Sequence, residues 1–100
     1  MVVVQVSVVP VGTGSPSVSR HVARCVDILE ESGLSFELNP MATVVEGELK
    51  AVLEAVVRMH DATFDGGAAR VLTTVTIDDR RDKPLTMSGK VEAVRRIRGK

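Results

Sequence analysis

The stretch 34-LSFELNPMATVVEGEL-49 predicts two short strands joined by a tight turn and followed directly by a helix. Residues 34–39 alternate apolar and polar side chains, which is typical of a half-buried strand. The pair Asn39-Pro40 marks a turn, and residues 41–46 read as the second strand. A hairpin followed directly by a helix is compatible with only a few folds. The segments on either side of it decide which of these folds the chain adopts.

The flanking segments complete a βαββαβ pattern around this hairpin. Residues 2–11 are rich in valine, which favours strands, and residues 69–80 alternate apolar and polar side chains again. Residues 17–33 and 47–65 carry apolar side chains at helical spacing, with charged residues on the opposite side. Both helices are therefore amphipathic and need a sheet to cover.

The order of elements predicts an α+β, ferredoxin-like fold. Two crossover helices would cover one face of a four-stranded antiparallel sheet. A short basic helix over residues 88–98 is extra to this pattern and closes the chain. We expect residues 1–100 to form one ferredoxin-like domain.

Composition excludes several classes of protein. The 13 acidic residues balance the 13 basic ones, so no global field attracts a nucleic-acid backbone. Phe36 and Phe64 are the only aromatic residues, which leaves little for the base stacking that single-strand binders use. We expect no nucleic-acid partner.

The chain is expected to work in the cytoplasm, away from membranes. The start, 1-MVVVQVSVVPV-11, is too short to span a bilayer and lacks the basic segment of a signal peptide. Cys25 is the only cysteine, so it can form no disulfide within the chain, which suits a reducing compartment.

Nothing in the sequence predicts catalysis, a metal site or a cofactor. His21 and His60 lie on separate predicted helices, and Cys25 lies on an apolar helix face where an inert thiol is usual. An acylphosphatase-type enzyme would need an arginine in the loop after the first strand, and 10-PVGTGSPS-17 has none. We therefore expect a protein that is not an enzyme.

The sheet face that the two helices leave open is predicted to be half polar. The apolar residues of each strand identify its core side, and the remaining residues belong to the open face. The side on which Thr43 lies stays undecided by this test, because the 41–46 strand has apolar residues on both sides. The polar residues assigned to the open face are Gln5, Ser7, Glu37, Asn39, Thr74 and Thr76.

Four segments, in the same order along the chain, closely resemble the thiamine-binding protein family, which includes the YkoF-like proteins. The proline-centred part of the second segment, followed by Glu-Gly-Glu, is the most specific. Ala42-Thr43 replaces the Gly-Thr that usually follows Pro-Met in the family. The segments are 7-SVVPVGTGSPSVSRHVA-23, 29-LEESGLSFELNPMATVVEGEL-49, 70-RVLTTVTIDDR-80 and 89-GKVEAV-94.

The resemblance implies a ferredoxin-like domain that binds thiamine or its hydroxymethylpyrimidine part and forms dimers or tetramers through its sheets. Thiamine combines a cationic thiazolium with an aminopyrimidine, so its pocket would need a carboxylate, an amide and hydroxyls beside apolar walls. The residues expected to supply these are Ser7, Glu37, Asn39, Met41, Thr43 and Thr74.

A second hypothesis needs no small-molecule ligand. The open face could serve only to join subunits of a structural or regulatory oligomer. Substitution of Glu37 or Asn39 would then change assembly or stability alone.

Overall fold

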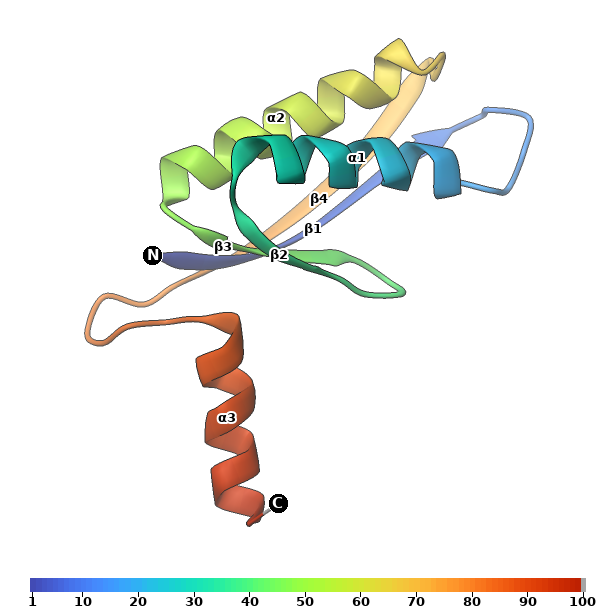
Figure 1. Ribbon diagram of the computed structural model, residues 1–100. Helices are drawn as coiled ribbons and strands as arrows, with labels where there is room; N and C mark the ends of the chain where they lie inside the picture. Colours follow the sequence, from blue (N-terminus) through green and yellow to red (C-terminus); the bar gives the residue numbers. More distant parts are fainter. Residues whose placement is uncertain (100) are drawn as a thin grey trace.

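The computed structural model describes residues 1–99 and contains four strands and three helices. Their order is the predicted βαββαβ pattern with an additional C-terminal helix (Figure 1). The strands are β1 (Val2–Val11), β2 (Ser35–Leu38), β3 (Thr43–Gly47) and β4 (Arg70–Asp79). The helices are α1 (Ser19–Ser32), α2 (Leu49–Asp65) and α3 (Met87–Arg98).

The strands form one antiparallel sheet in the order β2-β3-β1-β4, which confirms the ferredoxin-like fold. A hairpin joins β2 to β3. Helix α1 forms the crossover from β1 to β2, and α2 forms the crossover from β3 to β4, as predicted. Helices α1 and α2 both lie on one side of the sheet, as Figure 1 shows. The other side is the open face, and α3 leaves the body on that side.

The core lies between the sheet and the two covering helices. Alternate valines of β1 point into it, and Val4 is fully buried between Val45 and Ile77 of the neighbouring strands. The helices contribute fully buried side chains such as Ile28 and Leu29. The period-two pattern of β1 therefore identified the core side of the sheet correctly.

Three elements, α1, β3 and α2, begin two residues later than the sequence predicts. The N–H of Ser17 donates to Ser15 Oγ at 3.2 Å, so the loop before α1 continues further. Likewise, the N–H of Asn39 donates to the carbonyl of Ala42 at 3.0 Å. That bond holds residues 39–42 in the turn, and β3 starts only after it. Local side-chain and turn bonds compete with regular structure at such ends.

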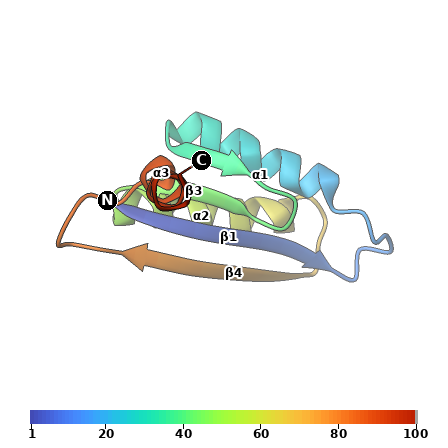
Figure 2. The ribbon, with the colours of Figure 1, turned by 90° about the horizontal axis from the view of Figure 1, so that it is seen from below.

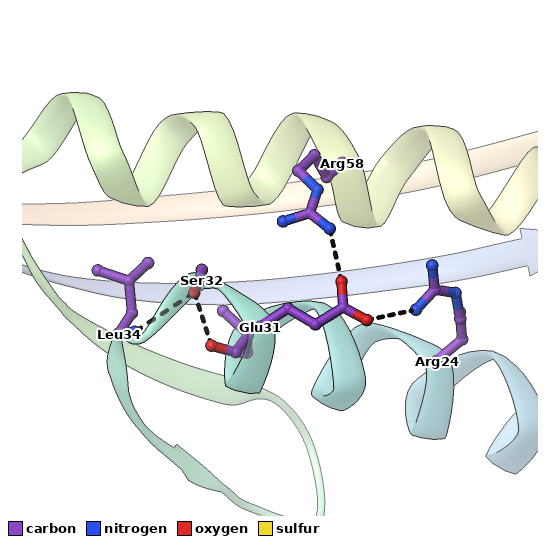
Figure 3. Close-up of polar contacts among 6 residues, drawn as sticks. Arg24, Glu31, Ser32, Leu34 and Arg58 are labelled. Carbon is purple, nitrogen blue, oxygen red and sulfur yellow. Dashed lines mark hydrogen bonds and ion pairs between the residues drawn. The ribbon is translucent and has the colours of Figure 1, made fainter.

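Glu31 links the two covering helices (Figure 3). Its carboxylate accepts hydrogen bonds from Arg58 of α2 at 2.7 Å and from Arg24 of α1 at 3.5 Å. The pKa of the Glu31 carboxyl is lowered, and the hydrogen bond from Arg58 is the largest cause. At the next residue, the Ser32 hydroxyl donates to the carbonyl of Leu29 at 2.6 Å and so secures the end of α1.

Candidate functional site

Strand β1 runs past the end of its neighbour β3. Pairing between them ends where Val6 lies opposite Thr43, whereas β1 stays paired with β4 as far as Val11 and Arg70. From Ser7 onward, the other edge of β1 has no strand beside it. Alternate main-chain N–H and C=O groups along this edge therefore have no ladder partner.

A cavity of about 160 Å³ lies at this edge. Its walls come from β1, from the β2–β3 turn and from the covering helices, and they are mostly apolar. It brings together four of the six residues predicted to bind a ligand: Ser7, Asn39, Met41 and Thr43. The other lining residues are Val6, Val8, Val9, Val18, Val22, Cys25, Leu38, Pro40, Ala42 and Met59.

Thr43 is the most buried polar group of the cavity, with an exposed fraction of 7%. Its cross-strand partners are Val6 and Leu38, so it lies on the helix-covered side of the sheet, which settles the side that the sequence left undecided. The Thr43 hydroxyl has no hydrogen-bond partner among the residues described. It remains accessible from the cavity. A hydroxyl that faces an apolar cavity without a protein partner is free to form a hydrogen bond with a bound molecule.

Ser7 and Asn39 add an uncommitted hydroxyl and an uncommitted amide. Across residues 1–99, neither side chain is hydrogen-bonded to the protein. Both residues line the same cavity as Thr43, although the Ser7 side chain lies on the open face of the sheet and that of Thr43 on the covered face. An amide both donates and accepts, and a hydroxyl can do either. Together with apolar walls, these groups suit a neutral ring that carries hydrogen-bond donors and acceptors.

Cys25 closes the cavity from α1. The thiol is free and buried, and it lies 3.9 Å from the carbonyl oxygen of Met59, to which it donates. Burial raises the pKa of the Cys25 thiol. The side chain therefore presents a neutral apolar surface to the cavity, as the sequence predicted, because the thiolate is the reactive form.

A shallow groove of about 770 Å³ continues from the cavity along α1. The cavity and the groove share lining residues of α1 and of the β2–β3 turn, among them Val22 and Asn39. The groove also contains the Asp27 carboxylate, which the sequence analysis missed. Its position could have identified it as a candidate site residue, because Asp27 follows Val26 directly and lies five residues after Val22, and both valines also line the groove.

Glu37 and Thr74 do not line the cavity. Glu37 lies opposite Val44 on the open face of the edge strand β2. Thr74 lies opposite Ser7 on the open face of β4. Both are exposed, on the face that the sequence analysis assigned to them. The six predicted residues thus divide into a cavity set of four and an open-face pair.

The two histidines lie elsewhere. His60 Nδ1 is 2.6 Å from the hydroxyl of Thr73, which ties α2 to β4, and its ring makes an edge contact with Phe64. His21 is buried at the α1–α2 contact, close to Gly66. Within residues 1–99, no three His, Cys, Asp or Glu side chains are grouped so that they could hold a metal ion. Over the same residues, no helix has the length and apolar character needed to cross a membrane.

Comparison with known proteins connects this geometry to a family. The model of a family described as thiamine-binding protein matches residues 4–95. A UPF0045 protein of Staphylococcus xylosus is 45% identical over 98 residues, covering 94% of this chain and 92% of the relative. The UPF0045 protein YqgV of Bacillus subtilis is 42% identical over 98 residues, covering 94% of each chain.

Solved structures share the fold. A hypothetical protein of Methanocaldococcus jannaschii, MJ1052, superposes with a TM-score of 0.87 at 34% identity, covering 93% of this chain and 94% of its own. TM0486 of Thermotoga maritima, which is named for thiamine biosynthesis or salvage, gives a TM-score of 0.74 at 26% identity. That match covers 94% of this chain and 98% of the other. The chain belongs to the thiamine-binding protein family.

Proposed function

We propose that this chain is a non-enzymatic binding protein for thiamine or its hydroxymethylpyrimidine part. The observation that carries the proposal is the hydroxyl of Thr43, a largely buried residue, which has no hydrogen-bond partner among the residues described and lies in the wall of an apolar cavity that Ser7 and Asn39 also line. An aminopyrimidine ring has an apolar plane and an edge of donors and acceptors. It would therefore satisfy these groups and fill the apolar space between them.

The size of the cavity restricts how such a ligand would bind. Typical small-molecule sites measure about 300–1,000 Å³, whereas this cavity measures about 160 Å³. One protomer therefore encloses a single ring and leaves the rest of the ligand outside. The groove along α1 starts at the mouth of the cavity and offers the Asp27 carboxylate to a cationic thiazolium.

The two open-face residues, Glu37 and Thr74, belong to a second part of the proposal. We infer that the open faces of two copies come together, in a dimer or a tetramer, and that the ligand lies near this interface. Glu37 would supply a second carboxylate and Thr74 a hydroxyl from that side. Apolar side chains exposed on the same face support the pairing, because isolated monomers rarely expose such a patch: Val9, Val11 and Leu72.

A non-enzymatic role agrees with the chemistry of the cavity. Its polar groups are hydroxyls, an amide and a thiol whose pKa is raised by burial. These groups bind and orient a ligand, but none is activated by a neighbouring base. We further propose that the protein acts in the cytoplasm, where the single free Cys25 would stay reduced.

The experiment that tests the proposal is isothermal titration calorimetry with thiamine and, separately, with hydroxymethylpyrimidine. The wild type should give saturable heat with both compounds if the cavity holds the pyrimidine ring. Asn39→Ala should weaken both titrations, because it removes a group that lines the cavity. Asp27→Asn should weaken thiamine binding alone, because only thiamine carries the cation.

Thr74→Ala tests the open-face part of the proposal separately from the cavity. It removes one exposed polar group from the open face and leaves the cavity intact. If Thr74→Ala weakens binding and Asn39→Ala does not, the ligand lies on the open face and the cavity assignment is wrong. Flat traces for the wild type at millimolar concentrations of both compounds would refute the proposed ligand. The alternative, a structural oligomer without a ligand, would then stand.

A further inference from the structure

A second pocket lies between the covering helices, where the start of α1 lies beside the end of α2. It belongs to the covered side of the sheet, since α2 lies behind the strands in the view from the open side (Figure 2). The pocket measures about 300 Å³, at the lower end of the range of about 300–1,000 Å³ for small-molecule sites. Among the residues described, it shares none with the cavity at the edge of β1. The residues that line this interhelical pocket are Arg20, His21, Arg24, Ala62, Thr63 and Gly66.

His21 is a buried polar side chain of the interhelical pocket. Its exposed fraction is 8%, and within residues 1–99 neither ring nitrogen takes part in a hydrogen bond. Neither nitrogen is sealed from solvent, so the ring can still contact a molecule in the pocket. His60, by contrast, has the hydroxyl of Thr73 2.6 Å from its Nδ1. An imidazole carries an N–H in either charge state, so His21 offers a donor that the protein leaves unused.

Gly66 leaves space beside the His21 ring. A Cβ at this position would lie 3.2 Å from Cε1 and 3.3 Å from Nδ1 of His21, closer than ordinary van der Waals contact. The backbone φ of Gly66 is −75°, which any residue can adopt. The missing side chain therefore affects the space in the pocket rather than the backbone, and it keeps the Nδ1 edge of the ring uncovered.

Two guanidiniums one helical turn apart give the pocket a positive charge. Within the part of the chain that the structure describes, Arg20 forms no ion pair. Arg24 shares Glu31 with Arg58, and its own contact is the longer one, at 3.5 Å against 2.7 Å (Figure 3). One carboxylate cannot neutralise two guanidiniums, and none of the residues that line the pocket is acidic.

The helix ends at the pocket have opposite polarity. The first turn of α1 contains no acidic residue, and Val18 provides no side-chain cap, so the positive end of that helix is uncompensated. The end of α2 presents carbonyl groups, two of which accept hydrogen bonds from the N–H groups of Gly66 and Gly67. A helix end is equivalent to about half an elementary charge. The full charges of Arg20 and Arg24 therefore decide that the pocket favours an anion.

We propose that the interhelical pocket binds the phosphoryl group of a small phosphate ester. Arg20 and Arg24 flank the anion, and His21 donates its N–H to a further oxygen. A phosphoryl group presents three oxygens in different directions, which suits donors from three side chains, and guanidiniums are preferred partners of phosphate. A carboxylate has only two oxygens in one plane and leaves one of these donors unused. The pocket is larger than a phosphoryl group needs, so the remainder of a small molecule fits beside Ala62 and Gly66. The proposal does not depend on any ligand in the cavity at the edge of β1.

The test is an NMR titration of the full chain, followed through its backbone amides at constant ionic strength. The three probes are glycerol 3-phosphate, inorganic phosphate and acetate. Wild type should show saturable shifts at residues 19–24 and 62–66 with the first two probes, and none with acetate. Arg20→Gln/Arg24→Gln should raise the Kd for glycerol 3-phosphate by at least about tenfold, because two charge-assisted contacts are lost.

Lys50→Gln/Lys83→Gln is the matched control. It removes the same number of positive charges from exposed positions near the other end of α2, and neither lysine lines the pocket. Because distant exposed charges are screened by salt, its Kd should stay within about twofold of wild type. His21→Phe keeps a flat ring and removes the donor, so it should raise the Kd by at least about threefold.

Several results would overturn the proposal. Wild type without saturable shifts at tens of millimolar glycerol 3-phosphate has no such site. An arginine double variant that binds like wild type, or like the lysine control, refutes the role of the two guanidiniums, and an unchanged Kd in His21→Phe refutes that of the imidazole. Equal binding of acetate would show that the pocket attracts any anion. Tighter binding of inorganic phosphate than of glycerol 3-phosphate would overturn the assignment to an ester.

Discussion

Replacing Thr43 with valine should stabilise the protein while weakening ligand binding. Thr43→Val keeps the shape of the side chain and exchanges the hydroxyl for a methyl group. The hydroxyl lies on a residue that is only 7% exposed and has no hydrogen-bond partner among the residues described. Its removal therefore breaks no bond within the protein and relieves a partial desolvation cost, because the hydroxyl is open only to the cavity.

The size of the effect follows from the degree of burial. An unsatisfied buried polar group costs about 1–3 kcal/mol. Because the Thr43 hydroxyl still faces the cavity, we take the lower end of that range and expect a gain of about 1 kcal/mol. For a domain of this size, such a gain raises Tm by about 4–8 °C. If a ligand hydrogen-bonds this hydroxyl, its Kd should rise by about threefold to tenfold in the variant.

Thr63→Val is the matched control. Thr63 is 2% exposed, but its hydroxyl donates to the carbonyl of Met59 at 2.9 Å. The same substitution at this position removes a satisfied hydrogen bond, so it should destabilise the protein by about 1 kcal/mol. Urea unfolding followed by circular dichroism measures both variants, and calorimetry with thiamine measures binding. If Thr43→Val were destabilised as much as Thr63→Val, the Thr43 hydroxyl would be satisfied in the folded state and the reasoning would be wrong.

Three further predictions follow from single side chains. Gly33→Ala should lower the free energy of unfolding in urea by about 1–2 kcal/mol, because φ is 74° at this helix end. The added methyl would meet no atom within 4 Å, so the cost is conformational, and an unchanged midpoint would contradict this. Leu29→Ala, at a fully buried position, should cost about 2–5 kcal/mol in the same assay. Leu53 is 36% exposed, so Leu53→Ala should cost less than half as much, and equal losses would show that α1 does not pack as described. Cys25 should react with iodoacetamide at pH 8 more slowly in the native protein than in urea. Burial blocks access to the thiol and raises its pKa, which lowers the fraction of reactive thiolate at that pH. Equal rates measured by mass spectrometry would refute this.

Much of the fold could be predicted from residue patterns alone. Alternation in β1 and β4 identified the core side of each strand, because side chains in a strand point to opposite faces in turn. The order of elements, together with the length of each connection, then left the ferredoxin-like arrangement as the expected topology. The open-face positions of Ser7, Glu37 and Thr74 follow from the same parity and agree with the strand register.

Tertiary structure alone decided which candidate residues meet. In the sequence, Thr43 lies in a strand with apolar residues on both sides, and only its pairing with Val6 and Leu38 places it under the helices. The cavity exists because β3 starts opposite Val6 while β1 continues, and strand lengths in different parts of a chain do not predict such an offset. Asp27 joins the site because α1 passes beside the β2–β3 turn.

The same division applies to α3. Its helical spacing and basic end are written in the sequence, because they depend only on residues within one turn of each other. Its direction depends on two distant contacts, from Met87 to Glu46 and from Lys90 to Asp78, which link parts of the chain 41 and 12 residues apart. Local patterns determine which faces of an element are apolar, but what those faces contact is determined only when separate segments pack together.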